Sequence, residues 1–472
     1  MTASAYRYPG VRPFERSERN TFFGRDQDLD HLFLLVSREP VTVLFGKSGT
    51  GKSSLVNAGL LPRLADASWH TCTFRFGAHR SGDTSATLSD LLLARAHETV
   101  GNNDAPNWLD DFAARHDIPI TLWHVLKKQE FQQGASRCDE LLVFDQFEEV
   151  FSWPASQLEN FKTELATVTR QSAPLPYLNA LKASNFDLPA NKMEQLLAPL
   201  EAHLLFVMRS DQLSWLDRLA DRLPGILRTR FETTSFTREQ ARHALVSPAQ
   251  LTGNFVSPSF VFTPAALDQL LGNLANEEGK IEPFQLQVYG QALEKRVIDH
   301  PGDTEIQPED LPDYQNIYEN YYQDALGQLP PEEAELAQRA IEEALLFEDQ
   351  NGEVRRLSVY EGMLQQQYHL SAATLRQLTD IHLLRAEPGV GGYYYEIAHD
   401  TLLMTILQSK RRRLGEGEQK TILEIQRNIV QQNELLREML EIRRRSMVRA
   451  SKIALLSILF NLLLFILLLR YC

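Results

Sequence analysis

The sequence is poor in cysteine, in positive relative to negative charge, and in long apolar runs outside its C-terminal end. Its three cysteines, Cys72, Cys138 and Cys472, are too widely spaced to form a metal-binding knuckle. So few cysteines are typical of a reducing compartment, where they occupy ordinary core or tail positions. The chain carries 48 Lys and Arg against 62 Asp and Glu, a formal net charge of −14. This acidic balance argues against broad non-specific binding to nucleic acid, which requires a basic surface.

The two ends of the chain bear on its location. The first residues, MTASAYRYPGVRPF, have no apolar segment behind a basic start, so we expect no secretory signal. Near the other end, only Ser457 and Asn461 interrupt a 17-residue apolar run, residues 453–469. As a helix this run would span about 26 Å, close to the lower limit for crossing a bilayer. Five basic residues precede it and one follows: Arg443, Arg444, Arg445, Arg449 and Lys452 before, Arg470 after.

The charge on either side of the apolar run predicts its orientation. By the positive-inside rule, the basic N-terminal side stays in the cytoplasm. The sequence therefore predicts a single-pass membrane protein with a cytoplasmic N-terminal body. A buried helix or a partner-binding helix is the alternative interpretation of residues 453–469.

The first half of the chain alternates between strand and helix patterns. With 43% hydrophobic and 23% charged residues, the chain has the composition of folded domains, and 472 residues allow about two to four of them. Short apolar runs of the kind found in strands buried on both faces predict a parallel α/β sheet. The predicted strands are residues 40–46, 69–77, 141–145 and 203–208.

The second half is mainly helical. From residue 235 the strand pattern fades until LLRAE, PGVGG and YYYEIAH, which predict a β-hairpin after the helix SAATLRQLTDIHLL. Helices that end in such a hairpin suggest a winged helix. Beyond a charged joint, apolar residues at a/d spacing over residues 422–439 fit a short coiled coil or one amphipathic helix equally well. The predicted parts are 1–236, 237–330, 331–408, 409–452 and 453–469.

The octapeptide GKSGTGKS, residues 46–53, matches the phosphate-binding pattern G-x-x-x-x-G-K-[ST] between a predicted strand and a predicted helix. Glycines let backbone N–H groups surround phosphates, and the helix that follows presents its positive end. Lys52 is expected to reach the β- and γ-phosphates, and the Ser53 hydroxyl to bind Mg²⁺. The predicted binding residues here are Gly46, Lys47, Ser48, Gly49, Thr50, Gly51, Lys52, Ser53 and Ser54.

Two further apolar strands end in polar side chains. LLVFDQFEE places Asp145 at a strand tip, which suits a rigid Mg²⁺-facing carboxylate. Glu148 or Glu149 would then position or deprotonate the attacking water, with Glu148 preferred, while the other would only favour a helix start. HLLFVMRSD contains an apolar strand with Arg209 at its polar tip, which either reads a γ-phosphate bidentately or forms an ordinary surface salt bridge.

Eight segments in order resemble one family of bacterial proteins. They are PGVRPF, FFGRD, the phosphate loop, DQFEE, MRSD, SFTREQARHAL, EPFQLQ and YEIAHDTLL, which together cover about residues 8–408. The chain resembles the novel STAND ATPases, signal-transduction relatives of NLR-type switches within the AAA+-like P-loop proteins. The resemblance implies an α/β P-loop NTPase domain, a helical lid and a winged helix, with ATP or ADP and Mg²⁺ as ligands.

The resemblance also implies roles for residues outside the phosphate loop. Phe23, Gly24 and Arg25 would form a strap beside the adenine, and Pro283 would lie against the base. His399 would contact the β-phosphate of ADP and hold a closed state. A capping loop, a proline at the start of a helix and a packed wing histidine are the alternatives.

Two arginine roles follow from the same resemblance. Arg209 would be the sensor arginine beside the Mg²⁺-binding strand. Arg228 and Arg230 lie near the place of an arginine finger, although related proteins often lack one. The predicted catalytic residues are Lys52, Asp145, Glu148, Glu149 and Arg209.

A nucleotide-controlled switch is the function that the resemblance implies. ADP would favour a closed state, and ATP an open state that forms a homo-oligomer in response to an unknown trigger or partner. Action at the bacterial inner membrane through residues 453–469, in antiphage defence, would follow; a membrane-tethered regulatory or scaffold ATPase is the alternative. No specific nucleic acid is expected, because the last helix before the hairpin has one arginine and one histidine instead of a basic face.

Overall fold

The structure is a computed structural model that describes residues 5–77, 86–100, 107–133, 139–170, 172–184, 187–349, 352–389 and 392–414. The chain divides into two units. One comprises Met1–Tyr321 with Asp380–His382, and the other Tyr322–Thr379 with the described part of Leu383–Cys472. The predicted NTPase segment and most of the predicted lid, up to Tyr321, lie in the first unit. The boundaries at residues 236, 330 and 408 stay predictions.

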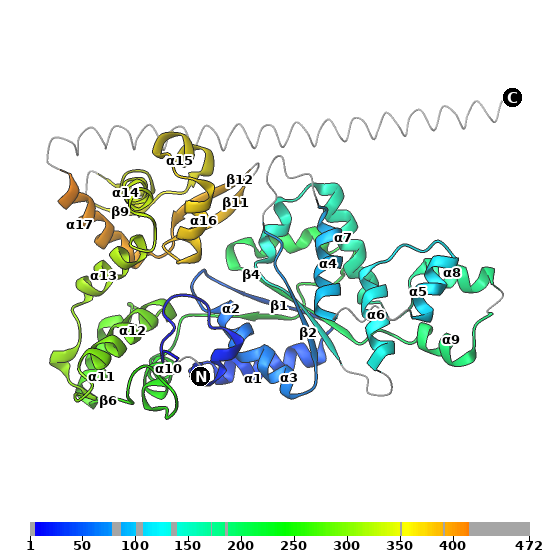
Figure 1. Cartoon of the computed structure of the whole chain (residues 1–472), viewed down its shortest axis with the longest axis horizontal. Helices are drawn as coiled ribbons and strands as arrows, with labels where there is room; N and C mark the ends of the chain where they lie inside the picture. The colour runs from blue at the N-terminus through cyan, green and yellow to red at the C-terminus, as the bar shows by residue number, and fades with distance from the viewer. Residues whose placement is uncertain are drawn as a thin grey trace. The chain divides into compact units, whose positions relative to one another are not determined.

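A five-stranded parallel sheet forms the centre of the first unit (Figure 1). Its order is β2-β3-β4-β1-β5. The strands are β1 (Val41–Gly46), β2 (His70–Phe74), β3 (Glu140–Phe144), β4 (Ala202–Arg209) and β5 (Arg230–Glu232). Four of them confirm the predicted strands, and β5 was not predicted. Gly46 is paired with Arg209 in the register, so the carboxyl ends of β1 and β4 lie side by side.

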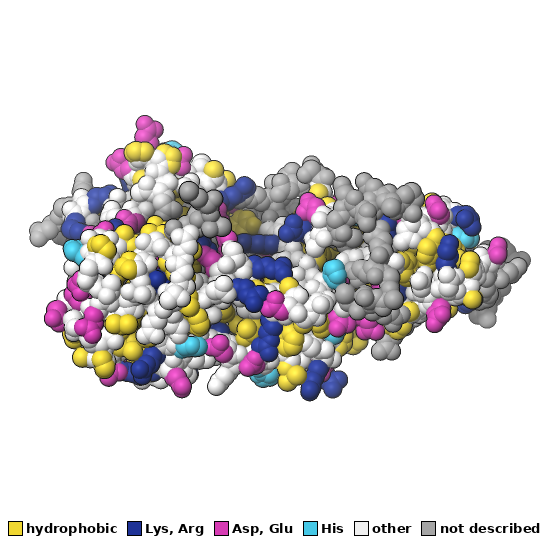
Figure 2. Space-filling view, turned by 60° about the horizontal axis from the view of Figure 1, so that its bottom comes forward, with side chains coloured by type: hydrophobic (Ala, Val, Ile, Leu, Met, Phe, Trp, Pro, Cys, Tyr) yellow, Lys and Arg dark blue, Asp and Glu magenta, His cyan; other side chains and the backbone are white. Residues whose placement is uncertain are grey.

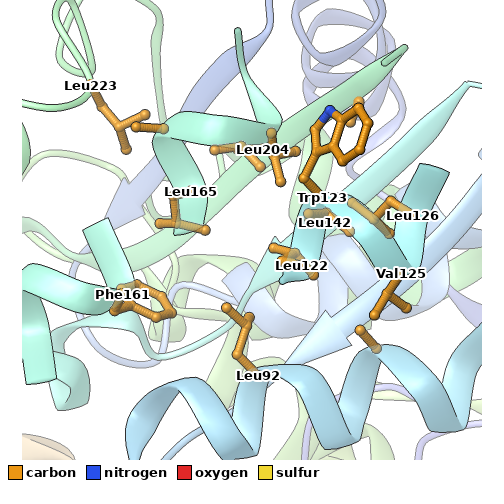
Figure 3. Close-up of a cluster of buried hydrophobic side chains, with 14 of the residues drawn as sticks. Leu92, Leu122, Trp123, Val125, Leu126, Leu142, Phe161, Leu165, Leu204 and Leu223 are labelled. Carbon is orange, nitrogen blue, oxygen red and sulfur yellow. The ribbon is translucent and has the colours of Figure 1, made fainter. Parts of the chain in front are cut away.

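Helices cover both faces of this sheet, as the uninterrupted apolar strands predict. On one face, α1 (Asp26–Arg38) and a continuous helix built from α2 (Lys52–Ser54), the π-helical η2 (Leu55–Leu60) and α3 (Leu61–Asp66) pack on Leu44, Val143 and Leu205. The other face carries Leu142, Phe144 and Leu204, which pack against the remaining helices of the sheet domain (Figure 3). These are α4 (Leu88–Val100), α5 (Trp108–Arg115), α6 (Leu122–Gln133), α7 (Ala155–Val168), α8 (Leu175–Ala183) and α9 (Ala190–Leu197).

A helical lid segment completes the first unit. It contains α10 (Arg238–Gln250), β6 (Val261–Phe262), α11 (Pro264–Leu274), α12 (Pro283–Asp299), β7 (Glu305–Ile306), η5 (Pro308–Asp310) and the start of α13 (Tyr314–Leu326). Local sequence fixes several of these helix starts. Thr237 caps α10 through a capping box with Gln240, and prolines occupy the first turns of α11 and α12, where a missing N–H costs nothing.

The second unit combines helices with two small sheets. Its elements in chain order are α14 (Pro331–Ala340), η6 (Ile341–Leu345), β8 (Leu346–Glu348), β9 (Val354–Arg356), β10 (Val359–Tyr360), α15 (Glu361–Tyr368), α16 (Ala372–Asp380), β11 (Leu384–Gly389), β12 (Gly392–Ile397), η7 (Asp400–Leu402) and α17 (Leu403–Arg413). The antiparallel pairing of β11 with β12 confirms the predicted hairpin. Strand β10 pairs with β12 on its other side.

The structure contradicts the predicted single-pass location in the inner membrane. Among the described residues, no helix is long and apolar enough to cross a bilayer. Even α12, with 17 residues, carries Glu294, Lys295 and Arg296, and such charges are costly in a hydrocarbon core. The apolar run 453–469, on which the prediction was based, lies outside the described residues, as does the a/d pattern of residues 422–439.

The surface charge is uneven. On the face shown in Figure 2, Lys and Arg side chains gather near the middle, and Asp and Glu side chains are spread around them. A formal net charge of −14 therefore coexists with local basic areas on the surface.

Candidate nucleotide-binding site

The phosphate loop connects β1 to α2 and depends on its glycines. Gly51 has a φ of 86°, in the left-handed region that glycine adopts without strain. Gly46 has a different constraint, because a Cβ there would lie 2.4 Å from the carbonyl oxygen of Thr233. The loop therefore needs glycine at both of these positions of the motif.

Lys52 lies at the start of α2 with its ammonium turned back onto the loop. Its Nζ donates to the carbonyl oxygens of Gly46 at 2.9 Å and Lys47 at 2.8 Å. Burial lowers the pKa of Lys52 to about 8, although the nearby carboxylate of Glu148 favours the charged form. The cation is thus partly desolvated and held at the loop, where phosphate oxygens are expected.

Ser53 and Asp145 form the predicted pair of magnesium ligands. The Ser53 hydroxyl donates to Asp145 Oδ1 at 3.3 Å and Oδ2 at 3.2 Å. Asp145 directly follows β3, and its N–H donates to the carbonyl of Phe74 at 2.9 Å, which fixes the strand tip. Burial raises the pKa of Asp145. A hydroxyl and a buried carboxylate on rigid elements are a donor set that fits Mg²⁺.

The two glutamates after Asp145 are buried but differ in their surroundings. Gln146 adopts a left-handed conformation (φ 53°), after which η3 (Phe147–Ser152) begins. Burial raises the pKa of Glu148 to about 7, against the opposing charges of Lys52 and Arg209. Burial also raises the pKa of Glu149, but the nearby cation that lowers it is Arg75. Of the two, Glu148 is therefore the one in the field of the phosphate-loop lysine.

Each of these glutamates keeps one unsatisfied oxygen. Oε2 of Glu148 and Oε2 of Glu149 are buried and have no hydrogen-bond partner among the described residues. Buried carboxylate oxygens normally have partners, and exceptions are frequent at functional sites. The orphaned oxygen of Glu148 is therefore consistent with a site that receives water beside a bound nucleotide.

Arg209 ends β4 beside the first residue of the phosphate loop. Its side chain is 13% exposed and forms a two-point contact with Asp211, from Nε to Oδ1 at 3.0 Å and from Nη2 to Oδ2 at 2.7 Å. The guanidinium is thus largely buried while its partner is 55% exposed, and the contact of Arg209 with a γ-phosphate stays a prediction.

The FFGR segment lies between the phosphate loop and the lid. The guanidinium of Arg25 is 3% exposed and donates to the carbonyls of Thr50 at 2.9 Å and Thr234 at 2.7 Å. Gly24 lies against α10, where a Cβ would come within 2.5 Å of a backbone oxygen. The ring of Phe23 lies edge-on to a histidine of α10. The contact of these residues with adenine stays a prediction, but Arg25 has a structural role that the motif did not indicate.

The remaining predicted residues occupy different places. Pro283 is the first residue of α12, the position given above as its alternative. Arg228 and Arg230 are both exposed, the latter at the start of edge strand β5. His399 directly precedes η7 in the second unit, so its contact with a nucleotide stays a prediction.

Sequence reasoning missed Arg75 as part of the site. This residue follows β2, the neighbour of β3 in the sheet, and its charge opposes burial by lowering the pKa of both Asp145 and Glu149. The predicted strand continued through Arg75 to residue 77, which hid its position at the strand end. The signal that could have identified Arg75 is the adjacency of β2 and β3 in the sheet, which the sequence alone does not give.

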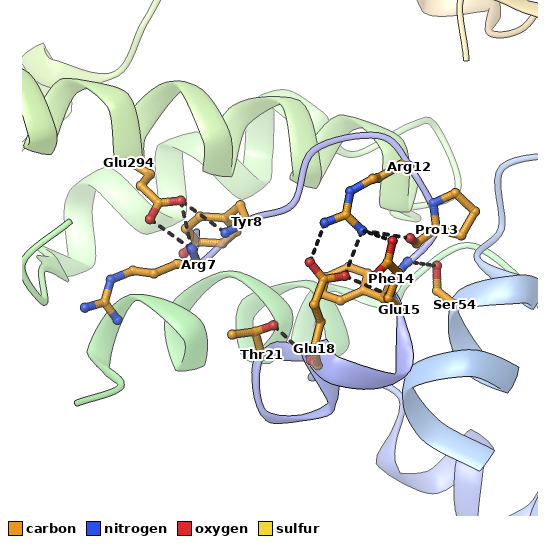
Figure 4. A network of polar contacts seen from close by, with 10 residues as sticks. All are labelled: Arg7, Tyr8, Arg12, Pro13, Phe14, Glu15, Glu18, Thr21, Ser54 and Glu294. Carbon is orange, nitrogen blue, oxygen red and sulfur yellow. Dashed lines mark hydrogen bonds and ion pairs between the residues drawn. The ribbon is translucent and has the colours of Figure 1, made fainter. Parts of the chain in front are cut away.

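The N-terminal leader was also recognised only as a motif. The carboxylate of Glu294 on α12 accepts from the N–H of Arg7 at 2.9 Å and of Tyr8 at 3.1 Å (Figure 4). Further along, the N–H of Phe14 donates to the hydroxyl of Ser54 at 3.1 Å. The leader therefore runs from the lid to the helix of the phosphate loop.

The packing of Tyr8 against α12 leads to a prediction about stability. A Cβ on Gly290 would lie 2.4 Å from the Tyr8 ring, which is 1% exposed. We expect Gly290→Ala to displace the leader and destabilise the protein by about 1–3 kcal/mol in chemical unfolding. The control is Gly272→Ala in α11, where nothing lies within 4 Å of the added methyl and a gain of about 0.5–1 kcal/mol is expected. Equal effects of the two substitutions would contradict the role of Tyr8.

Together these features define a class of protein. A parallel sheet with GKSGTGKS between β1 and α2, and an aspartate at the tip of β3 hydrogen-bonded to the serine of the motif, is the arrangement of a P-loop NTPase. The chain matches the model of the family Novel STAND NTPase 1 over residues 8–406, and it belongs to this family. It is accordingly a P-loop NTPase.

Comparison with solved structures gives only distant likenesses. The ORC1 protein of Aeropyrum pernix in complex with DNA is 14% identical, with 83% of this chain and 93% of that chain covered and a TM-score of 0.40. The ORC2 protein of the same organism, in ADPNP-ADP complexes, is 14% identical over 90% and 97%, with a TM-score of 0.41. The Walker-type ATPase paby2304 of Pyrococcus abyssi is 13% identical over 84% and 98%, at 0.40. The search of curated proteins gave no match.

Proposed function

We propose that the protein is a switch whose state depends on whether ATP or ADP is bound. The observation that carries this proposal is the continuity between the phosphate site and the lid. Arg25 joins the carbonyl of Thr50 in the phosphate loop to the segment before α10, and the leader joins Ser54 to Glu294. A nucleotide shifts a conformational equilibrium only through contacts that differ between states, and these links would carry such a difference from the loop to the lid.

The residues of the site divide the chemical work. Bound Mg²⁺·ATP supplies the γ-phosphoryl group and the charge of the metal ion. Lys52 would bind the β- and γ-phosphates, while Ser53 and Asp145 would hold the metal ion. The carboxylate of Glu148 would orient the attacking water and take its proton, because its raised pKa lies near working pH. Glu149 would support this site from the side of Arg75.

The second unit would report which nucleotide is bound. Its helices followed by the β11–β12 hairpin, with β10 paired to β12, are consistent with a winged helix. We assign His399 the role of a contact to ADP that closes the switch. ATP would release it, and the opened protein would assemble into a homo-oligomer, with the exposed Arg228 and Arg230 as candidates for contacts between copies. A role in bacterial conflict would be the outcome of that assembly.

Nucleotide affinity tests the assignment of His399. We expect His399→Ala to weaken ADP binding about tenfold, the effect of about 1.4 kcal/mol, and to leave the affinity for a non-hydrolysable ATP analogue within about twofold. Isothermal titration with each nucleotide measures both values. His300→Ala, which removes an exposed histidine of the lid, is the matched control and should change neither. Equal losses for both nucleotides, or no loss for ADP, would remove His399 from the switch.

A further inference from the structure

The side chain of Arg209 is already occupied by a carboxylate in this structure. Asp211 presents two oxygens to Nε and Nη2 of Arg209, at 3.0 and 2.7 Å. This is the fork-to-fork geometry in which a guanidinium also binds phosphate. The carboxylate of Asp211 therefore satisfies the same donors that a γ-phosphate would require.

The pair lies at the phosphate site. Arg209 is beside Gly46 in the register of β4 with β1, and Asp211 follows two residues later in the first turn of η4 (Ser210–Leu219). The charges of both residues also act on the ammonium of Lys52. Arg209 is largely buried, whereas Asp211 is more than half exposed.

We propose that Asp211 is a positioning residue that holds Arg209 through a contact which ATP must displace, and so sets the preference of the site for ATP over ADP. The proposal rests on the proposed function, a switch that responds to ATP and ADP, and it gives Arg209 the role expected from the sequence, the binding of the γ-phosphate. ADP has no γ-phosphate and does not compete for the guanidinium. The pair therefore lowers the affinity for ATP and leaves the affinity for ADP unchanged.

Removal of the charge on Asp211 tests this proposal. In Asp211→Asn the amide offers one neutral acceptor in place of two charged oxygens, and we expect a non-hydrolysable ATP analogue to bind about three- to tenfold more tightly. ADP affinity should stay within about twofold. Asp211→Glu, which keeps the charge, should return toward the wild-type ratio. Isothermal titration of each variant with both nucleotides provides the values.

Two controls separate this effect from a general change in charge or folding. Asp217→Asn removes an exposed carboxylate two turns further along η4 and should leave both affinities unchanged. In an Arg209→Ala background, Asp211→Asn should have no effect on the ratio, because the side chain through which it acts is gone. A melting temperature within about 2 °C of wild type would exclude a purely structural role at the start of η4.

The outcomes distinguish a failure of the role of Asp211 from a failure of the proposed function. If wild-type protein binds both nucleotides but Asp211→Asn leaves the ratio unchanged, weakens ATP binding or shifts both affinities equally, the role of Asp211 is overturned alone. If Asp211→Asn changes the ratio equally with and without Arg209, the coupling through Arg209 is overturned. If neither nucleotide binds wild-type protein, the proposed function fails and this inference fails with it.

Discussion

Replacing Lys52 with methionine should remove most of the stabilisation that Mg²⁺·ATP gives to the protein, while the nucleotide-free protein becomes no less stable. Lys52 is the cation that the phosphate loop holds at its centre, through the carbonyls of Gly46 and Lys47. Loss of a buried charged partner typically costs 2–5 kcal/mol of binding free energy, so the affinity for ATP should fall by about 30-fold or more.

The effect on stability has the opposite sign because the ammonium is desolvated. Burial lowers the pKa of Lys52 from 10.5 to about 8. Below pH 8 the folded protein must keep a charge in a poorly solvated place, and between pH 8 and 10.5 it releases a proton that the unfolded chain still binds. The contribution of Lys52 to the free energy of unfolding is therefore lowest below pH 8. It rises between pH 8 and 10.5, by up to about 3 kcal/mol. Methionine removes this penalty at neutral pH.

Thermal unfolding with and without Mg²⁺·ATP measures both effects. At 100 times the dissociation constant of wild-type protein, ATP should stabilise wild-type protein by about 2.7 kcal/mol and the variant by about 0.9 kcal/mol or less. Lys47→Met is the matched control. Lys47 is expected to bind phosphate through its backbone N–H, which methionine keeps, and loss of its exposed side chain should change affinity less than about threefold. A Lys52→Met protein that ATP still stabilises as strongly as wild type would show that this loop does not bind the phosphates.

The parts of the site that the sequence predicted are those encoded by consecutive residues. The loop from Gly46 to Ser53 and the aspartate after an apolar strand are local patterns, and the sheet then brings Ser53 and Asp145 together. The pairing of Arg209 with Asp211 was also local, but a strand end alone does not show which partner a guanidinium takes. The β5 strand has three residues, too few for a period to emerge.

The missed features depend on contacts between distant residues. The backbone of Arg7 contacts Glu294, 287 residues away, and nothing in PGVRPF or in α12 indicates this pairing. Arg25 is predicted to form part of a strap beside adenine, and its guanidinium also binds backbone carbonyls of the phosphate loop and of the segment before α10, which the motif does not indicate. A side chain that binds main-chain atoms leaves no complementary residue type in the sequence. The end of the helix predicted over SAATLRQLTDIHLL was wrong for a similar reason. In the structure α16 ends at Asp380, shortly before β11, which pairs with β12.

Glu148→Gln should make the protein more stable at pH 8 while it greatly slows ATP hydrolysis. Burial raises the pKa of this carboxyl from 4.5 to about 7. Between these values the folded protein binds a proton that the unfolded chain has released, so stability falls as pH rises through the window and stays low above it. The full loss is up to about 3 kcal/mol, and a neutral amide avoids it. We expect a gain of about 2–3 kcal/mol at pH 8 and little change near pH 4.5.

Catalysis should respond in the opposite direction. A general base acts only when deprotonated, so the hydrolysis rate of wild-type protein should rise with pH through about 7, and Glu148→Gln should lower it about 10²- to 10⁴-fold. Urea unfolding and phosphate release at several pH values measure the two properties on the same samples. Unchanged hydrolysis in Glu148→Gln would transfer the role of base to Glu149.

The chain supplies a matched control at the other end of the same strand. Glu140, the first residue of β3, is 8% exposed, and burial raises its pKa to about 7 as well. Glu140→Gln should therefore give a similar gain in stability at pH 8, but it should leave hydrolysis unchanged because Glu140 lies at the opposite end of β3 from Asp145. Suppose that both substitutions stabilise the protein and only Glu148→Gln stops hydrolysis. The stability that the protein loses by burying the Glu148 carboxylate is then a consequence of its catalytic role. If both lower hydrolysis alike, Glu148 acts through the sheet and not on the attacking water.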